Sequence, residues 1–107
     1  MAEIPKLTEA DFEAEVLKST IPIIADFTAA WCGPCKMLDP VIVQLSQDWQ
    51  GKVKIVKLDV DDNSNLAVQY GVMGVPTLIL FVNGVPVQRL SGYQPKDRII
   101  SKFGSYI

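Results

Sequence analysis

Two stretches of this chain carry apolar side chains on both faces of an extended backbone. Residues 21–28 alternate in this way, and residues 53–60 repeat the pattern with two interspersed lysines. Successive side chains of a strand point to opposite faces, and strands that are apolar on both faces are typical of parallel sheets covered by helices on each side. The sequence therefore predicts an α/β protein with a central sheet between two helical layers.

The remaining elements complete the expected topology. Apolar residues at helical spacing predict four helices, one beginning at Thr8, one from Gly33 to about Trp49, one near residues 63–70 and one opened by Pro95. Asn83-Gly84 is a strong hairpin signal between strands at residues 75–82 and 85–91. With a brief strand before the first helix, the order is βαβαβαββα. We expect a central mixed five-stranded sheet flanked by four helices.

The composition indicates one globular domain and excludes several classes of function. The chain has 107 residues, 49% hydrophobic and 21% charged, with a net charge of −2. Because its basic residues are dispersed and no apolar run approaches the length of a membrane span, we expect neither nucleic-acid nor membrane partners. The N-terminus has no signal-peptide core. We expect a single domain over residues 1–107, a monomer and a cytoplasmic location.

The segment Trp31-Cys32-Gly33-Pro34-Cys35-Lys36 holds the only two cysteines of the chain. The apolar spacing that follows places this pair at a helix N-terminus, where free N–H groups and partial positive charge favour a thiolate. The thiolate is the attacking species in thiol–disulfide exchange, so the motif indicates redox chemistry without a bound cofactor. Since histidine is absent, Cys-His hydrolysis and histidine-containing metal sites are excluded.

Two alternatives for the cysteine pair remain open. A purely structural disulfide that closes so short a loop would stabilise the fold by only about 2 kcal/mol. A zinc site needs four ligands, of which one pair supplies half, so it would require a symmetric dimer. We expect no metal site.

Asp26 is anomalous because it lies in the middle of a strand that is otherwise apolar on both faces. Burial of an ionised carboxyl is costly, so the pKa of Asp26 should be raised. A carboxyl poised near neutrality can accept and return protons. Lys57, on the neighbouring strand, is the expected partner whose charge opposes this shift and tunes it.

These features together resemble the thioredoxin family over essentially the whole chain. The resemblance rests on Asp26, the segment from Trp31 to Met37, Pro40, Lys57-Leu58-Asp59, Tyr70-Gly71, Gly74-Val75-Pro76-Thr77, Phe81, Asn83-Gly84 and Gly92. It implies reduction of disulfides in other proteins through a redox-active Cys32–Cys35 disulfide. It also implies re-reduction by a thioredoxin reductase, with electrons from NADPH or, in some lineages, from ferredoxin.

The resemblance assigns the two cysteines different roles. Cys32 is the expected nucleophile that forms a mixed disulfide with the substrate, and Cys35 resolves it. We expect Cys32 to be the more exposed of the two and to ionise at lower pH. Asp26 is the expected general base beneath Cys35. Gly33-Pro34 sets the redox poise and is the dipeptide that marks reducing members.

The resemblance also predicts a substrate surface. X-Pro bonds are cis in only about 5–6% of cases in folded proteins, but the family has a cis bond at the position of Val75-Pro76. This bond would expose the backbone of Val75 to an extended substrate segment. Trp31, Gly74, Val75 and Gly92 would then rim a shallow apolar patch around Cys32.

Four positions depart from the family pattern, among them Ala30, which is small where a charged or polar residue is frequent. Thr28 stands where an aromatic side chain is common, which should open or repack the region beside the active-site helix. Asp39 precedes Pro40, where alanine or serine is usual; pointing inward it would disfavour the Cys35 thiolate, and pointing outward it would pair with Lys36. Met73 widens the apolar surface beside Val75.

Two further functions stay open on the sequence alone. One is a specialised or oxidising protein with the same fold, which the reduction potential would distinguish. The other is a binding module that uses the same face as a scaffold, with incidental thiols.

Overall fold

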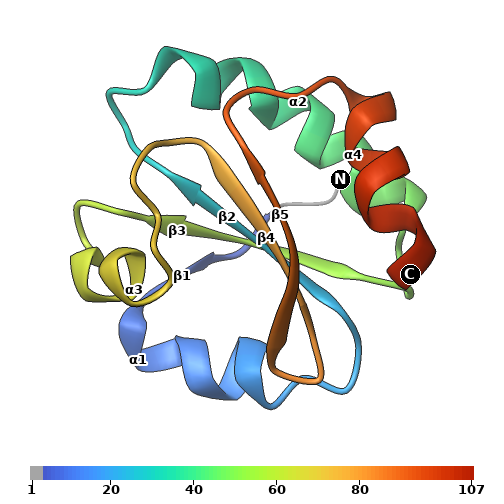
Figure 1. Cartoon of the computed structure of the whole chain (residues 1–107), viewed down its shortest axis with the longest axis horizontal. Coiled ribbons are helices and arrows are strands. Elements are labelled where there is room, and N and C mark those ends of the chain that lie inside the picture. Colours follow the sequence, from blue (N-terminus) through green and yellow to red (C-terminus); the bar gives the residue numbers. More distant parts are fainter. Residues whose placement is uncertain (1–3) are drawn as a thin grey trace.

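The core of the molecule is a five-stranded mixed sheet with the strand order β1-β3-β2-β4-β5 (Figure 1). The computed structural model describes residues 4–107. The strands are β1 (Lys6–Leu7), β2 (Ile23–Thr28), β3 (Lys54–Asp59), β4 (Thr77–Val82) and β5 (Val85–Ser91). β3 is parallel to both β1 and β2, whereas β4 is antiparallel to β2 and to β5. The predicted mixed sheet is confirmed.

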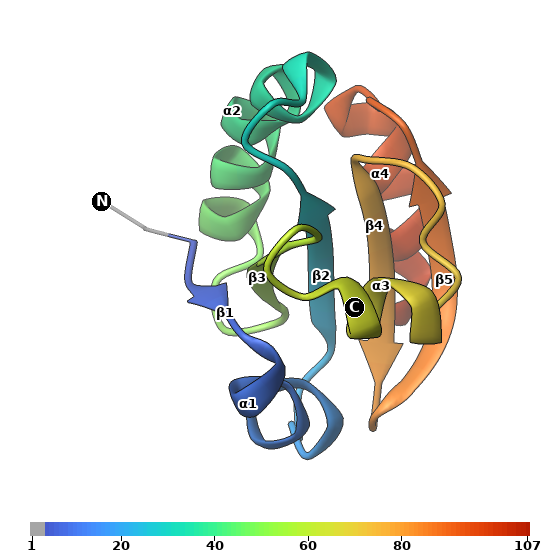
Figure 2. The same ribbon diagram turned by 90° about the vertical axis from the view of Figure 1, so that its left-hand side faces the viewer.

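Helices cover both faces of this sheet (Figure 2). The helices are α1 (Glu9–Phe12), which continues as a π-helical turn over Glu13–Leu17, α2 (Gly33–Asp48), α3 (Ser64–Gln69) and α4 (Lys96–Phe103). The apolar side chains of α1 and α3 pack on one face, and those of α2 and α4 pack on the other. The predicted α/β class and the order βαβαβαββα are therefore confirmed.

The middle strand β2 explains why the sequence pattern was apolar on both sides. Ile23, Ala25 and Phe27 pack in the cluster formed with α1 and α3, whereas Ile24 packs in the cluster formed with α2 and α4. Asp26 belongs to the same face as Ile24 because side chains alternate along a strand. Its backbone pairs with Lys57 on β3 and with Leu78 on β4. The one carboxyl of β2 thus lies mid-sheet beneath α2.

β2 and β4 each begin two residues later than the sequence predicted, in both cases just after a proline. β2 begins at Ile23, after Pro22, and β4 begins at Thr77, after Pro76. Proline has no N–H to donate to the hydrogen-bond ladder, so each proline precedes its strand. Pro86 lies in β5, which is the edge strand that its presence predicted.

The hairpin between β4 and β5 uses the predicted Asn83-Gly84 turn, in which both residues have positive φ (52° and 78°). The turn lies against the end of the first helical segment, since a Cβ on Gly84 would lie 2.5 Å from the carbonyl oxygen of Leu17. Glycine is therefore required here both for its conformation and for the close approach.

Gly84→Ala is expected to lower the free energy of unfolding by about 3 kcal/mol, from left-handed strain together with displaced backbone. The matched control is Gly51→Ala, because Gly51 also has positive φ (84°) but open space around it; its cost should be about 1 kcal/mol. Denaturant unfolding of both variants measures the difference. Equal losses would show that the contact with Leu17 contributes nothing.

Candidate active site

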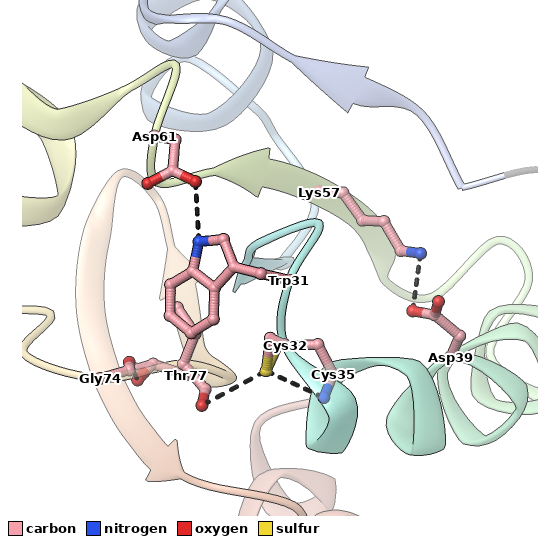
Figure 3. The surroundings of a disulfide bond; sticks show 9 residues. Trp31, Cys32, Cys35, Asp39, Lys57, Asp61, Gly74 and Thr77 are labelled. Carbon is pink, nitrogen blue, oxygen red and sulfur yellow. Dashed lines mark hydrogen bonds and ion pairs between the residues drawn. A yellow bond between two sulfur atoms is a disulfide. The ribbon is translucent and has the colours of Figure 1, made fainter.

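The two cysteines form a disulfide at the N-terminus of α2 (Figure 3). Cys32 is the N-cap residue in an extended conformation, and Pro34 lies in the first turn, where its missing N–H costs nothing. The side chain of Cys32 caps the helix, because its Sγ accepts a hydrogen bond of 3.1 Å from the backbone N–H of Cys35. A sulfur in this position lies where the helix favours negative charge.

The expected difference in exposure between the two cysteines is wrong for this disulfide form. Each is only 3% exposed. Cys32 Sγ lies 3.6 Å from the carbonyl oxygen of Val75, and both cysteines form one cluster with Ala29, against which Val60 and Val75 pack. The segment before Pro76 therefore covers the first cysteine as effectively as the helix covers the second, which the local sequence around the motif could not indicate.

The peptide bond between Val75 and Pro76 is cis, as the resemblance predicted. Thr77 Oγ1 donates a hydrogen bond of 2.8 Å to the carbonyl oxygen of Gly74, and the backbone N–H of Gly92 donates one of 2.7 Å to the carbonyl oxygen of Pro76. These bonds fix the loop before β4 beside the disulfide. The structure thus holds Gly92, which follows β5, against the segment Gly74-Val75-Pro76.

An apolar hollow of about 140 Å³ adjoins this loop. It is lined by Trp31, Val60, Val72, Met73, Gly74 and Val75. Trp31 and Met73 are 69% and 99% exposed, so both residues present apolar surface to solvent. Gly92 does not line this hollow but an adjoining depression, which shares Met73, Gly74 and Val75 with it. The four residues predicted to rim the patch thus line the hollow or its neighbour, and Pro76 supports the loop through its carbonyl oxygen.

The sequence interpretation missed Asp61, which accepts a hydrogen bond of 2.9 Å from the indole Nε1 of Trp31 (Figure 3). Asp59 positions it, because Asp59 Oδ1 accepts a 2.8 Å hydrogen bond from the backbone N–H of Asp61. The signal was available: β2 and β3 are parallel neighbours, so the loops after their carboxyl ends meet at the same edge of the sheet. An aspartate just after β3 is therefore within reach of a side chain just after β2.

Asp26 is buried as predicted, at 1% exposure, and its Oδ1 has no hydrogen-bond partner. Burial raises the pKa of this carboxyl from 3.8 to about 7; the charge of Lys57 opposes the rise and that of Asp39 adds to it. The carboxyl therefore changes its protonation state near neutral pH. This is the property that a reversible proton acceptor requires.

Lys57 does not form an ion pair with Asp26, and the expected pairing of Asp39 with Lys36 is wrong. Lys57 Nζ lies 2.7 Å from Asp39 Oδ1, so the carboxylate on α2 pairs with β3 rather than with Lys36 (Figure 3). The spacing along the helix could not show this, because the partner comes from another element. Lys57 still acts on Asp26 through its charge.

A second hollow, of about 250 Å³, lies between Thr28 and the first turns of α2. It is lined by Lys6, Thr28, Ala29, Ala30, Cys35, Lys36, Asp39, Lys57 and Asp59. The small side chains of Thr28 and Ala30 leave this space open beside α2, as the sequence predicted for Thr28. The hollow brings solvent to the Asp39–Lys57 pair and to the neighbourhood of Cys35.

The comparisons with known proteins agree with this geometry. The thioredoxin family model matches residues 3–105. Relatives described as thioredoxin include one from Synechocystis sp. at 43% identity and one from Haemophilus influenzae at 46%, each over 107 residues and the full length of both chains. Another, from Staphylococcus aureus, is 49% identical over 96 residues, which is 90% of each chain.

The chain belongs to the thioredoxin family. It is an oxidoreductase of the protein-disulfide reductase type that acts through the Cys32–Cys35 disulfide and binds no cofactor. Within residues 4–107, no three or more potential ligands from His, Cys, Asp and Glu are grouped to hold a metal ion. Over the same residues, no helix is long and apolar enough to cross a membrane.

Proposed function

We propose that Cys32 is the attacking sulfur and Cys35 the resolving sulfur of this reductase. The observation that carries the assignment is the 3.1 Å hydrogen bond from the N–H of Cys35 to Cys32 Sγ at the helix N-terminus. After reduction of the disulfide, this bond and the helix end stabilise negative charge on Cys32. The dipeptide Gly33-Pro34 between the two cysteines contains no side chain that would further stabilise the reduced form. A less stabilised reduced form is the better reductant, so this dipeptide favours a reducing potential.

The exchange then runs in two steps. The Cys32 thiolate attacks one sulfur of the substrate disulfide, the substrate S–S bond breaks, and the other substrate sulfur leaves as a thiolate. The Cys35 thiol next loses its proton and attacks Cys32 Sγ, so the mixed disulfide breaks and the second substrate sulfur leaves. The substrate gains two electrons, and the protein becomes the disulfide that the structure contains.

Asp26 accepts the proton of Cys35 in the second step and Lys57 tunes it. The support is the burial of the carboxyl, its pKa of about 7 and the opposing charge of Lys57. Substrates lie against the apolar hollow beside Trp31, Gly74 and Val75, with Pro76 and Gly92 holding the loop that lines it. The exposed backbone before Pro76 suits a substrate in extended conformation.

The partners follow from the need to regenerate the dithiol. We infer a thioredoxin reductase as electron donor, drawing on NADPH, and disulfide-containing proteins as substrates. A reducing role favours the cytoplasm, where thiols are kept reduced. One domain over residues 1–107 and a monomeric state are supported by the single sheet and the two core clusters that its own helices complete.

NADPH-driven turnover tests the proposed partner. With a thioredoxin reductase and insulin as substrate, the chain should sustain NADPH oxidation measured at 340 nm, and the variant with both Cys32 and Cys35 changed to serine should not. If the double variant retained the protein's function in cells, that would support a scaffold role instead. Reduction of insulin by dithiothreitol-reduced protein, without turnover by the reductase, would keep the disulfide chemistry but reject this electron donor.

A further inference from the structure

Asp39 lies one helical turn beyond Cys35, on the side of α2 that faces β3. Its Oδ1 lies 2.7 Å from Lys57 Nζ, and no other carboxylate among residues 4–107 lies within 4.0 Å of that ammonium. Lys57 and Asp26 are register partners on adjacent strands, yet Asp26 has no ion pair and its Oδ1 accepts no hydrogen bond. The Lys57 ammonium thus acts by charge on the buried carboxyl of Asp26 but forms its ion pair only with Asp39, the more exposed of the two.

The ion pair between Lys57 and Asp39 costs less desolvation free energy than a pair between Lys57 and Asp26 would. Asp39 and Lys57 are both partly exposed, so their ion pair keeps part of its hydration. A pair with Asp26 would have to bring the ammonium towards a carboxyl that is 1% exposed, and its desolvation would oppose the Coulomb attraction. Because the lysine side chain is flexible, the position of the Lys57 ammonium depends on which carboxylate it pairs with, and here that carboxylate is Asp39.

We propose that Asp39 is a positioning residue for the proton-transfer step: it holds the Lys57 ammonium on the α2 side of the hollow, away from the carboxyl of Asp26. Without Asp39, two carboxyls remain beside Lys57: Asp59, whose Oδ1 already accepts hydrogen bonds from the N–H groups of Asp61 and Asp62, and Asp26, its register partner, whose Oδ1 has no partner. Loss of the Asp39 charge and the approach of Lys57 would both lower the pKa of Asp26, so the two effects add. This inference rests on the proposed role of Asp26 only for its kinetic consequence.

Three other charged groups surround this hollow. They are Lys36 on α2, Lys6 on β1 and Asp59 at the end of β3. Only Lys57 and Asp39 act by charge on the pKa of Asp26, and β4 places Leu78 opposite it. Cys35 also lines the hollow but does not titrate while it is in the disulfide. Experiments on the oxidised protein therefore isolate the carboxyl.

Asp39→Asn in the oxidised protein is the direct test, followed by carbon-13 NMR of the Asp26 carboxyl as a function of pH. The midpoint of the Asp26 titration should fall by about 1 pH unit, the size expected when an opposite charge approaches a carboxyl. The control is Asp48→Asn, on the same helix, where Asp48 pairs with Lys96 at 2.6 Å far from the site; it should leave the midpoint unchanged. A midpoint that moves no more in Asp39→Asn than in Asp48→Asn overturns the proposal.

A second comparison asks whether Asp39 acts through Lys57. In a Lys57→Gln background, Asp39→Asn should shift the Asp26 midpoint clearly less than it does with Lys57 present; an equal shift would mean that Asp39 acts only by its own charge and would overturn the positioning role. Asp39→Glu, which keeps the carboxylate, should return the midpoint towards that of the parent. With Lys57 intact, the Lys57 side-chain NMR signals in Asp39→Asn should follow the ionisation of Asp26 more strongly than in the parent, and unchanged signals would contradict the proposal.

The kinetic consequence separates this inference from the role of Asp26. In Asp39→Asn, the pH profile of mixed-disulfide resolution should move to lower pH together with the Asp26 titration, while the first attack by Cys32 keeps its profile. If the titration moves and the rate profile of resolution does not, Lys57 is positioned as proposed but Asp26 is not the proton acceptor.

Discussion

Asp26→Asn is expected to become more stable relative to the parent protein as pH rises from about 4 to about 8, by about 4 kcal/mol in total. Burial raises the pKa of Asp26 in the folded state from 3.8 to about 7. Each pKa unit by which the folded state differs from the unfolded state corresponds to about 1.4 kcal/mol in the free energy of unfolding. Asparagine has nearly the same shape but no charge, so Asp26→Asn removes this dependence of stability on pH.

The sign follows from the proton count in each state. Between pH values of about 4 and 7, the folded protein keeps a proton on Asp26 that the unfolded chain has lost, so the stability of the parent falls as pH rises through this window. Above about pH 7, both states are ionised and the penalty stays constant. Below about pH 4, Asp26 is protonated in both states. The free energies of unfolding of the parent and of Asp26→Asn should then differ only by the effect of replacing a carboxylic acid with an amide.

Urea unfolding of the oxidised protein at several pH values measures this difference without interference from free thiols. The control is Asp62→Asn, because Asp62 is an exposed aspartate in the turn after β3; its difference from the parent should be nearly independent of pH. A difference between Asp26→Asn and the parent that is equally independent of pH would show that the carboxyl is not held in an environment that disfavours its charge.

The same variant tests the proposed proton transfer. Asp26→Asn should slow resolution of the mixed disulfide more than the first attack, because only Cys35 needs a proton acceptor when it becomes the nucleophile. Rapid-mixing kinetics with a chromogenic disulfide separates the two steps. Equal slowing of both steps would argue against the general-base role.

The sequence predicted the fold and the chemistry of the site because both depend on local patterns. Alternation in residues 21–28 and 53–60 defined strands buried on two faces, and Asn83-Gly84 defined the hairpin. The burial of Asp26 followed from the same alternation. The cis bond at Pro76 came from the resemblance alone, since local pattern favours trans.

The parts that the sequence did not predict depend on contacts between elements. The partner of Asp39 is on β3, and the partner of Trp31 follows β3, so neither could be found from spacing within α2 or its preceding loop. The equal burial of the two cysteines likewise depends on Val75, which is 43 residues from Cys32. These contacts become visible only when the loops at one edge of the sheet are brought together.

Changing each cysteine alone should have opposite consequences for the reaction intermediate. Cys35→Ser should accumulate a mixed disulfide through Cys32, because the attacking sulfur remains and the resolving sulfur is gone. Cys32→Ser should abolish turnover and accumulate little adduct, because the remaining sulfur lies further into the helix. Mass spectrometry of each variant after incubation with a substrate disulfide identifies the adduct and its position.

The central claim is that the N-terminus of α2 makes Cys32 the sulfur that reacts as a thiolate. Limiting iodoacetamide applied to the reduced protein over a series of pH values, with the label located by mass spectrometry, measures this most directly. We predict that the label appears first on Cys32, at a pH well below the value near 8.5 at which an ordinary cysteine ionises. A label that appears first on Cys35, or on both cysteines only near that ordinary value, would contradict the claim.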